Sequence, residues 1–147
     1  MTATAAPTRR ATWKATFAAA AIGAVGGLVV NTLIAVAARA LGAPDEFQQL
    51  TLPVYGPLTV IGALIAAIAW RSIVNRSRNA AGVLRILVPV VLVLSLIPDV
   101  LLLSSKSQPG TTTGGVIALI LMHFGVAVAA VPAFQRLMPP RSHDDAR

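Results

Sequence analysis

The sequence predicts an all-α integral membrane protein, a transmembrane bundle of four helices with both termini in the cytoplasm. Of its 147 residues, 56% are hydrophobic and only 12% are charged, which is far more apolar than a soluble domain of this size. The charged residues stand in short clusters that are separated by four long apolar stretches. Basic residues flank these stretches unequally, and the asymmetry gives the bundle a direction.

The first apolar stretch runs from about residue 17 to residue 38. A helix of this length is about 33 Å long, which exceeds the hydrocarbon core of about 30 Å. Arg9, Arg10 and Lys14 precede the stretch, a pattern that secretory and twin-arginine signals share. We favour an uncleaved first helix, because the apolar region of a signal has only about 7–15 residues and because further spans follow.

Three further stretches are long enough to span a bilayer: about residues 54–70, 83–103 and 115–134. The four stretches together define a transmembrane domain of residues 13–136. We expect disordered cytoplasmic tails on both sides of it, at residues 1–12 and 137–147.

Two connections are expected on the outer side of the membrane. Residues 41–53 contain Gly42, Pro44, Asp45 and Glu46 and form either one short interfacial helical turn or a plain loop. Residues 104–113 are rich in Ser and Thr and contain a Pro-Gly pair, which indicates a flexible polar connection.

The direction of the bundle follows from the Lys and Arg residues in each segment. Three precede the first span, four lie between the second and third spans, and three follow the fourth, so ten of the twelve are on one side. The other two loops hold only Arg39 and Lys106, together with Asp45 and Glu46. By the positive-inside rule we expect both termini in the cytoplasm and a multi-pass protein of the plasma or inner membrane.

Composition excludes several classes of function. The net charge is +7, but the basic residues do not form the contiguous face that a nucleic-acid binder needs, so we expect no nucleic-acid partner. They flank the apolar stretches, so we expect them to contact lipid headgroups of the bilayer. The absence of cysteine excludes disulfides, iron–sulfur clusters and thiolate zinc sites. No glycine-rich phosphate loop and no set of ligands with metal-binding spacing occurs, so we expect neither a cofactor nor a metal.

Small residues predict where the helices pack. On the first helix Gly23, Gly27 and Asn31 recur every four residues, so they share one face where another backbone can approach closely. On the second helix the small residues Gly62, Ala63, Ala66 and Ala67 are spaced in the same way. Asn31 either completes this packing face or contacts a ligand, and we favour packing.

The third span carries Ser95 and Asp99 on one face, with Pro98 between them. Pro98 lacks a backbone N–H, which predicts a kink or an end of the helix at this point. If the helix begins near Arg85, Asp99 lies about 21 Å along it and inside the membrane. If the helix begins near Asn79, Asp99 reaches the outer boundary and is an ordinary interfacial charge.

On the fourth span His123 lies near the middle of the membrane. A lone histidine at this depth is either a neutral, hydrogen-bonded side chain or a ligand-binding or catalytic group, and we favour the first reading. A rise of about 1.5 Å per residue places His123 at nearly the same depth in the membrane as the other polar side chains of the spans. We therefore expect one polar cluster in the outer half of the bundle. Its members are Asn31, Tyr55, Thr59, Ser95, Asp99 and His123.

The motifs Ser95-Leu96-Ile97-Pro98-Asp99 and Leu121-Met122-His123 carry a resemblance to a known family. The chain resembles a family of small four-span bacterial membrane proteins that is classed only as a domain of unknown function. The resemblance covers about Phe17 to Arg136. It implies a four-helix membrane domain in which Asp99 and His123 belong to a family pattern, and it implies no activity.

Three functions fit these residues. We favour a binding or interaction module whose outer polar pocket and small-residue faces hold a lipid-like ligand, a membrane protein partner or a second copy of the chain. One alternative is a membrane-embedded enzyme that uses Asp99 and His123 for proton transfer on a hydrophobic substrate. The other is a proton-coupled carrier or channel subunit, because ionisable residues inside a membrane mark such pathways.

Overall fold

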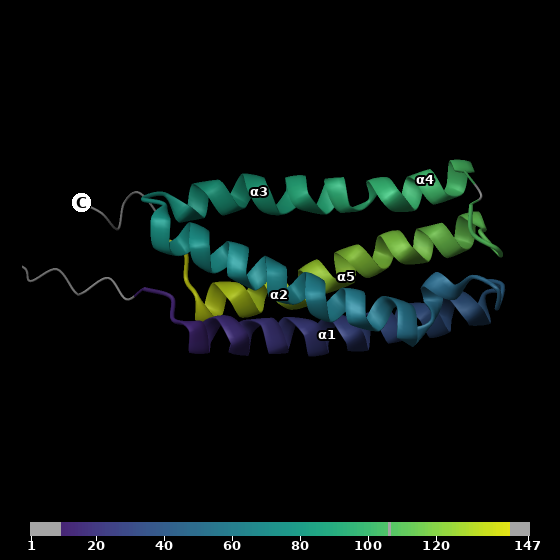
Figure 1. Ribbon diagram of the computed structural model, residues 1–147, viewed down its shortest axis with the longest axis horizontal. Helices are drawn as coiled ribbons and strands as arrows, with labels where there is room; N and C mark the ends of the chain where they lie inside the picture. The colour runs from purple at the N-terminus through teal and green to yellow at the C-terminus, as the bar shows by residue number, and fades with distance from the viewer. Residues whose placement is uncertain (1–9, 106, 142–147) are drawn as a thin grey trace, which may run out of the picture.

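The computed structural model describes residues 10–105 and 107–141, and the described chain is built from helices alone (Figure 1). In chain order the elements are α1 (Trp13–Ala40), the 3-10 turn η1 (Gln48–Leu50), α2 (Leu52–Arg76), α3 (Ala80–Ser95), α4 (Ile97–Ser105) and α5 (Thr113–Leu137). Helices α3 and α4 together form one span, so the structure has four segments that are long and apolar enough to cross a bilayer. The predicted count of four spans is therefore confirmed, and the chain is a multi-pass membrane protein.

The helices are longer than the apolar stretches of the sequence, because polar residues outside these stretches cap the helix ends. Thr12 accepts a hydrogen bond from the N–H of Ala15 and starts α1. Asn79 caps α3, and Thr112 caps α5, each accepting from the backbone N–H three residues further on. Side chains of this kind satisfy N–H groups that have no partner in the first helical turn.

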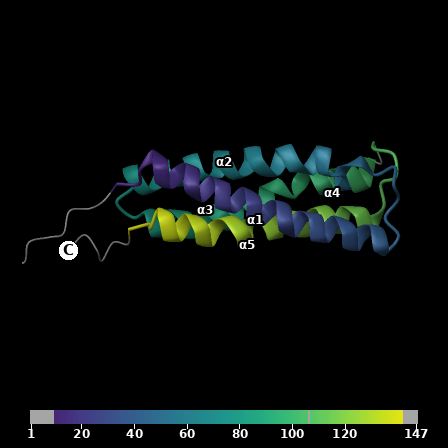
Figure 2. The same ribbon diagram turned by 90° about the horizontal axis from the view of Figure 1, so that it is seen from below.

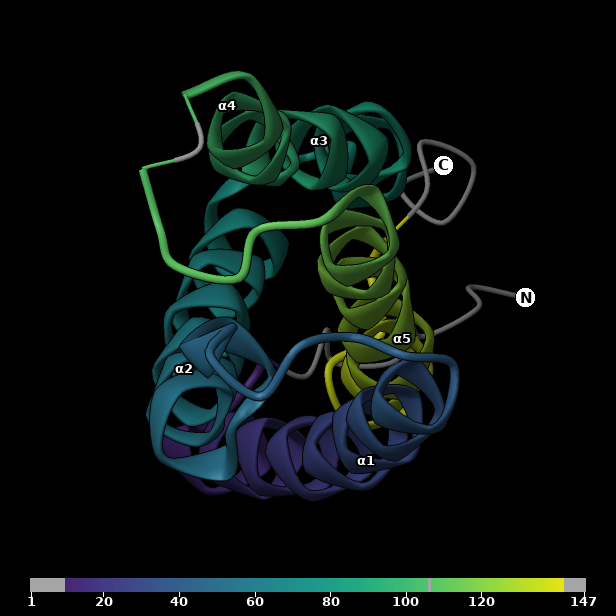
Figure 3. The same cartoon turned by 90° about the vertical axis from the view of Figure 1, so that its right-hand side faces the viewer.

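The four spans stand at the corners of a square when viewed along the bundle, with α2 and α5 each placed between α1 and the α3–α4 span (Figure 3). Helix α1 packs along most of its length against α5 and α2, and Figure 2 shows it lying across both. Small residues allow this close approach: a Cβ on Gly23 would lie 3.0 Å from the Cβ of Ala130, and one on Gly27 would lie 3.0 Å from Thr59.

The third span is held much more loosely than the others. Only 6% of the most apolar stretch of Ala80–Ser105 is buried within the protein, against 28% to 39% for the other three spans. Contacts from α3 to α2 and α5 are correspondingly sparse. Large apolar side chains such as Ile86 and Val93 are exposed on its surface, which is the pattern of a helix that faces lipid.

Both ends of the described chain lie at one end of the bundle, which we call the terminal end (Figure 1). There the Trp70 ring N–H donates to the carbonyl of Met138, and Arg71 and Asn75 both donate to the carbonyl of Ala11. Residues 10–12 and 137–141 fall within the expected disordered tails, but the structure holds Ala11 and Met138 in buried positions. The remainder of both tails lies outside the described residues.

The opposite end, which we call the loop end, consists of residues 41–51 and 107–112. Phe47 is fully buried there and its ring packs against Gly115 of α5. Arg39 donates to the carbonyls of Pro44 and Phe47 and pairs with Asp45 at 3.5 Å. Of the two structures considered for the first loop, a short helical turn is present, as the 3-10 turn η1.

Candidate functional site

A cavity of about 500 Å³ occupies the space that the loose third span leaves inside the bundle. All four spans line it, together with Gln49 from η1. Leu58 of α2 and Val91 of α3 both line the cavity and are 66% and 53% exposed, so the cavity is partly open between these two helices. An opening on this side of a transmembrane bundle faces lipid.

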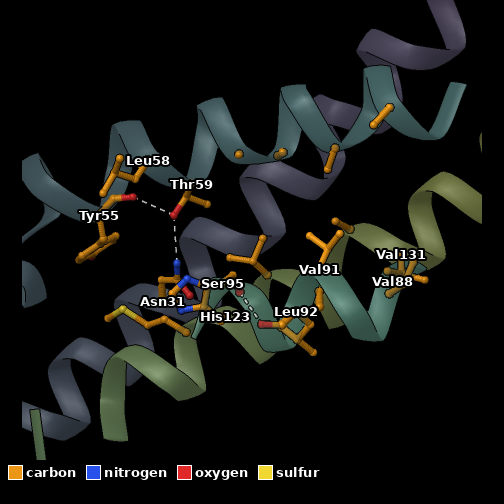
Figure 4. A pocket seen from close by; sticks show the side chains of 18 of the residues that line it. Asn31, Tyr55, Leu58, Thr59, Val88, Val91, Leu92, Ser95, His123 and Val131 are labelled. Carbon is orange, nitrogen blue, oxygen red and sulfur yellow. Dashed lines mark hydrogen bonds between the residues drawn. The ribbon is translucent and has the colours of Figure 1, made fainter. Parts of the chain in front are cut away.

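The six polar residues expected from the sequence all line this one cavity, near its loop end. In Figure 4, Asn31, Ser95 and His123 come together from three different spans, opposite Tyr55 and Thr59. Apolar side chains, among them Val88 and Val131, continue the lining away from this cluster. The cavity therefore has one polar end and one long apolar end.

A hydrogen-bond relay fixes the amide of Asn31. Its Nδ2 donates to the Thr59 hydroxyl at 3.0 Å, and that hydroxyl donates to the Tyr55 carbonyl at 2.8 Å (Figure 4). Because the only hydroxyl proton of Thr59 goes to Tyr55, Thr59 must accept from Asn31, and this sets which side of the amide carries oxygen. Asn31 Oδ1 is left buried with no partner among the described residues.

Asp99 and His123 form the second polar group. His123 Nδ1 lies 3.1 Å from Asp99 Oδ2 and 3.0 Å from the Leu119 carbonyl. A carbonyl only accepts, so Nδ1 carries a hydrogen, and that single hydrogen serves two acceptors. Asp99 is 7% exposed and Oδ2 has no other partner in the described part of the chain, so its carboxylate is poorly satisfied for so buried a group.

The α3–α4 span breaks at Leu96, as Pro98 predicts. The span begins at Ala80, capped by Asn79, so the later of the two expected starting points is wrong and Asp99 lies about 28 Å along the span. Asp99 is nevertheless no ordinary interfacial charge, because it is buried against His123. Ser95 turns back and donates to the Leu92 carbonyl of its own helix at 2.7 Å.

The sequence reasoning missed Gln49, whose Oε1 is buried in the cavity wall without a partner among the described residues. It lies in a loop, where no periodicity points to the bundle interior. The expected packing role of Gly62 and Ala66 is also corrected. Both are exposed and line the cavity, since α3 stands away from this face of α2, whereas Ala63 and Ala67 of the same predicted set are buried.

The model of a family of unknown function, DUF6069, matches residues 7–139. The chain belongs to the DUF6069 family. No curated protein and no solved structure matches it. The DUF6069 match includes all four spans and hence every residue that lines the cavity, and it extends beyond the range of Phe17 to Arg136 over which the resemblance was expected.

In this DUF6069 chain the site offers a limited chemistry. No group of three His, Asp or Glu side chains that could hold a metal occurs within residues 10–105 and 107–141. The polar end presents several hydrogen-bond acceptors and one carboxylate, and the apolar end presents only aliphatic and aromatic side chains. The arrangement can bind an amphiphilic molecule, and the Asp99–His123 pair can hold or pass a proton.

Proposed function

We propose that this protein is a membrane-embedded binding module for a lipid-like molecule. The observation that carries the proposal is the shape and polarity of the cavity: about 500 Å³, open towards lipid, with a polar cluster at one end and an apolar slot behind it. Small-molecule sites in proteins have volumes of about 300–1,000 Å³ and combine an apolar lining with a few convergent polar groups.

The length of the apolar slot supports a single hydrocarbon chain as the occupant. From Thr59 to Trp70 on α2, and from His123 to Phe134 on α5, the cavity lining advances by 11 positions along the helix. A helix advances about 16 Å over that distance, close to one leaflet of the bilayer's hydrocarbon core of about 30 Å. A chain from one leaflet therefore matches the slot.

The orientation belongs to the same proposal. Arg71, Arg76, Arg78 and Arg85 lie at or near the terminal end, whereas the described loop end carries Arg39 with Asp45 and Glu46. The positive-inside rule then places both termini in the cytoplasm and the polar end of the cavity in the outer half of the membrane. Alkaline phosphatase inserted in residues 41–51 should be active, whereas a fusion at the C-terminus should be inactive; the reverse pattern contradicts this orientation.

Filling the apolar slot tests the binding function. Ala127 lines the cavity on α5, and the neighbouring Val128 is 72% exposed on the lipid-facing side. In Ala127→Phe the new ring occupies the slot, so purified protein should retain much less bound lipid-like molecule than wild type by native mass spectrometry. Val128→Phe is the matched control and should retain the wild-type amount. Equal amounts in both variants contradict the proposal.

A second candidate function rests on the 3.1 Å contact between Asp99 and His123. Such a pair can transfer a proton to or from a bound molecule, in an enzyme or in a proton-coupled carrier. His123→Gln keeps a side chain that forms hydrogen bonds, but this side chain neither takes up nor releases a proton near neutral pH. Loss of turnover or of proton flux into liposomes, with folded yield and ligand retention unchanged, supports this function; unchanged turnover or flux, or loss of the fold, counts against it.

A further inference from the structure

The polar end of the cavity has an excess of hydrogen-bond acceptors. Asn31 Oδ1 and Gln49 Oε1 are buried and have no hydrogen-bond partner among the described residues, and the buried Asp99 Oδ2 has only the His123 Nδ1 hydrogen, which it shares with the Leu119 carbonyl. They come from three separate segments, α1, η1 and α4, and they line one cavity. A buried acceptor without a partner costs about 1–3 kcal/mol, so two of them beside a carboxylate that shares a single hydrogen indicate that a bound molecule supplies donors there.

The hydroxyl donors of the protein itself are already in use at this end. One of the two N–H groups of the Asn31 amide serves Thr59, the Thr59 hydroxyl serves the Tyr55 carbonyl, and the Ser95 hydroxyl serves the Leu92 carbonyl. The Tyr55 hydroxyl is paired with Thr32 at 2.9 Å. An acidic head such as a carboxylate or phosphate would bring more acceptors, and a negative charge beside Asp99, to a site whose hydroxyl donors are all in use.

The buried carboxylate of Asp99 also favours a head that donates hydrogen bonds. His123 is the one ion-pair partner of Asp99 in the described part of the chain, and it shares the Nδ1 hydrogen with Leu119. A buried carboxylate is strongly favoured by a cation that also donates hydrogen bonds. An ammonium group has three donors and one positive charge, so one such group can serve the Asp99 carboxylate and the two amide oxygens together.

We infer that the cavity takes a single-chain amphiphile with an amine head, whose ammonium group donates to Asp99, Asn31 and Gln49 while its chain fills the apolar slot. This inference rests on the proposed function, because it names the class of lipid-like molecule that the same site binds. It excludes fatty acids and phosphate-headed lipids as the preferred occupant.

Trp70 provides a reporter for the test because it lines the far apolar end of the cavity and is 4% exposed. The background variant Trp13→Phe makes it the only tryptophan, since the sequence has two. Three single-chain probes carry a nitroxide near the tail end and differ only in the head: an amine, an alcohol and a carboxylic acid. Quenching of Trp70 fluorescence is titrated in nanodiscs of phosphatidylcholine.

The amine should quench Trp70 at a concentration at least about tenfold lower than the alcohol or the acid, which corresponds to one charge-assisted hydrogen bond. Asp99→Asn should remove this preference, and its folded yield and thermal unfolding in detergent report whether the variant is folded. Gln49→Leu, which removes an acceptor outside the spans, should weaken amine binding more than alcohol binding.

Three outcomes separate this inference from the proposed function. A preference for the amine that disappears in Asp99→Asn supports both. Saturable quenching of equal strength by all three probes, or a preference for the acid, overturns the amine head and leaves the binding module standing. Absence of saturable quenching with every probe overturns the inference together with the proposed function.

Discussion

Small residues determine how closely each pair of helices approaches. Gly23 lies at a close contact of α1 with the backbone of α5, where a Cβ would come within 3.0 Å of the Ala130 Cβ and 3.2 Å of its Cα. Gly62 lies on α2 with nothing within 4 Å of the position that its Cβ would take. The same residue type therefore permits helix contact at one position and leaves open space at the other.

Substituting leucine at these two glycines should give opposite results. Gly23→Leu forces α1 away from the backbone of α5 and should lower the free energy of unfolding by about 1–3 kcal/mol, the usual cost of overpacking. Gly62→Leu extends into the cavity and should keep wild-type stability while it lowers binding of the amine probe. Thermal unfolding in detergent and Trp70 quenching measure the two effects. Equal stability of both variants contradicts the packing described for α1 and α5.

At the scale of elements, the break between α3 and α4 sets the position of Asp99. Pro98 has no N–H to donate to the Leu94 carbonyl and its ring crowds that carbonyl, so the helix is interrupted at Leu96 and restarts at Ile97. Asp99 lies in the first turn of α4, directed at His123 on α5. A continuous helix would turn this carboxylate to a different direction.

Pro98→Ala restores the missing donor and should straighten the span. We expect folded yield and stability at or above the wild-type values, together with weaker binding of the amine probe, because Asp99 is displaced from His123 and from the cavity. Pro89→Ala is the control, since Pro89 lies inside α3, is exposed, and is remote from the polar end. An unchanged amine preference in Pro98→Ala means that the break does not position Asp99.

At the scale of the whole molecule, α1, α2 and α5 form a packed unit, and the α3–α4 span closes the cavity beside it. α1 holds α2 and α5 together through close contacts, and the terminal end is tied by the Trp70–Met138 hydrogen bond and by the bond from Ala81 N–H to the Arg141 carbonyl. The α3–α4 span contributes mainly one wall of the cavity. A ligand that contacts both parts adds contacts that the protein alone does not have.

Binding should therefore stabilise the protein as a whole. At a free probe concentration of 100 times its dissociation constant, the amine should raise the free energy of unfolding by about 2.7 kcal/mol. The rise should appear as a higher melting temperature that depends on probe concentration. Gly62→Leu should show almost no rise. A melting temperature that stays constant for the wild type with saturating amine contradicts a site shared between the two parts.

Much of the architecture could be predicted from the sequence, because a bilayer allows few structures for long apolar segments. The four spans, the break at Pro98 and the convergence of Asn31, Asp99 and His123 all follow from hydropathy, proline chemistry and helix rise. The exposure of Gly62 could not be predicted, since small residues indicate where a backbone can approach and not which helix does so. Gln49 was missed because a loop residue carries no periodic signal.

The same limit applies to the cavity. Its existence depends on how far α3 stands from α2 and α5, and this distance results from side-chain packing between segments remote in the chain. The sequence placed the polar groups at one depth, but it contained no sign of the apolar slot behind them.

The most direct test of a chain-binding cavity is to find where a bound chain lies. A hexadecylamine that carries a photoreactive diazirine near its tail end is cross-linked to the protein in nanodiscs, and the labelled residues are mapped by mass spectrometry. The label should fall on cavity residues such as Val88, Ala127 and Val131, and an excess of unlabelled amine should suppress it. Labelling that is confined to lipid-facing residues such as Val36, Ile86 and Val128, and that excess amine does not suppress, contradicts the account.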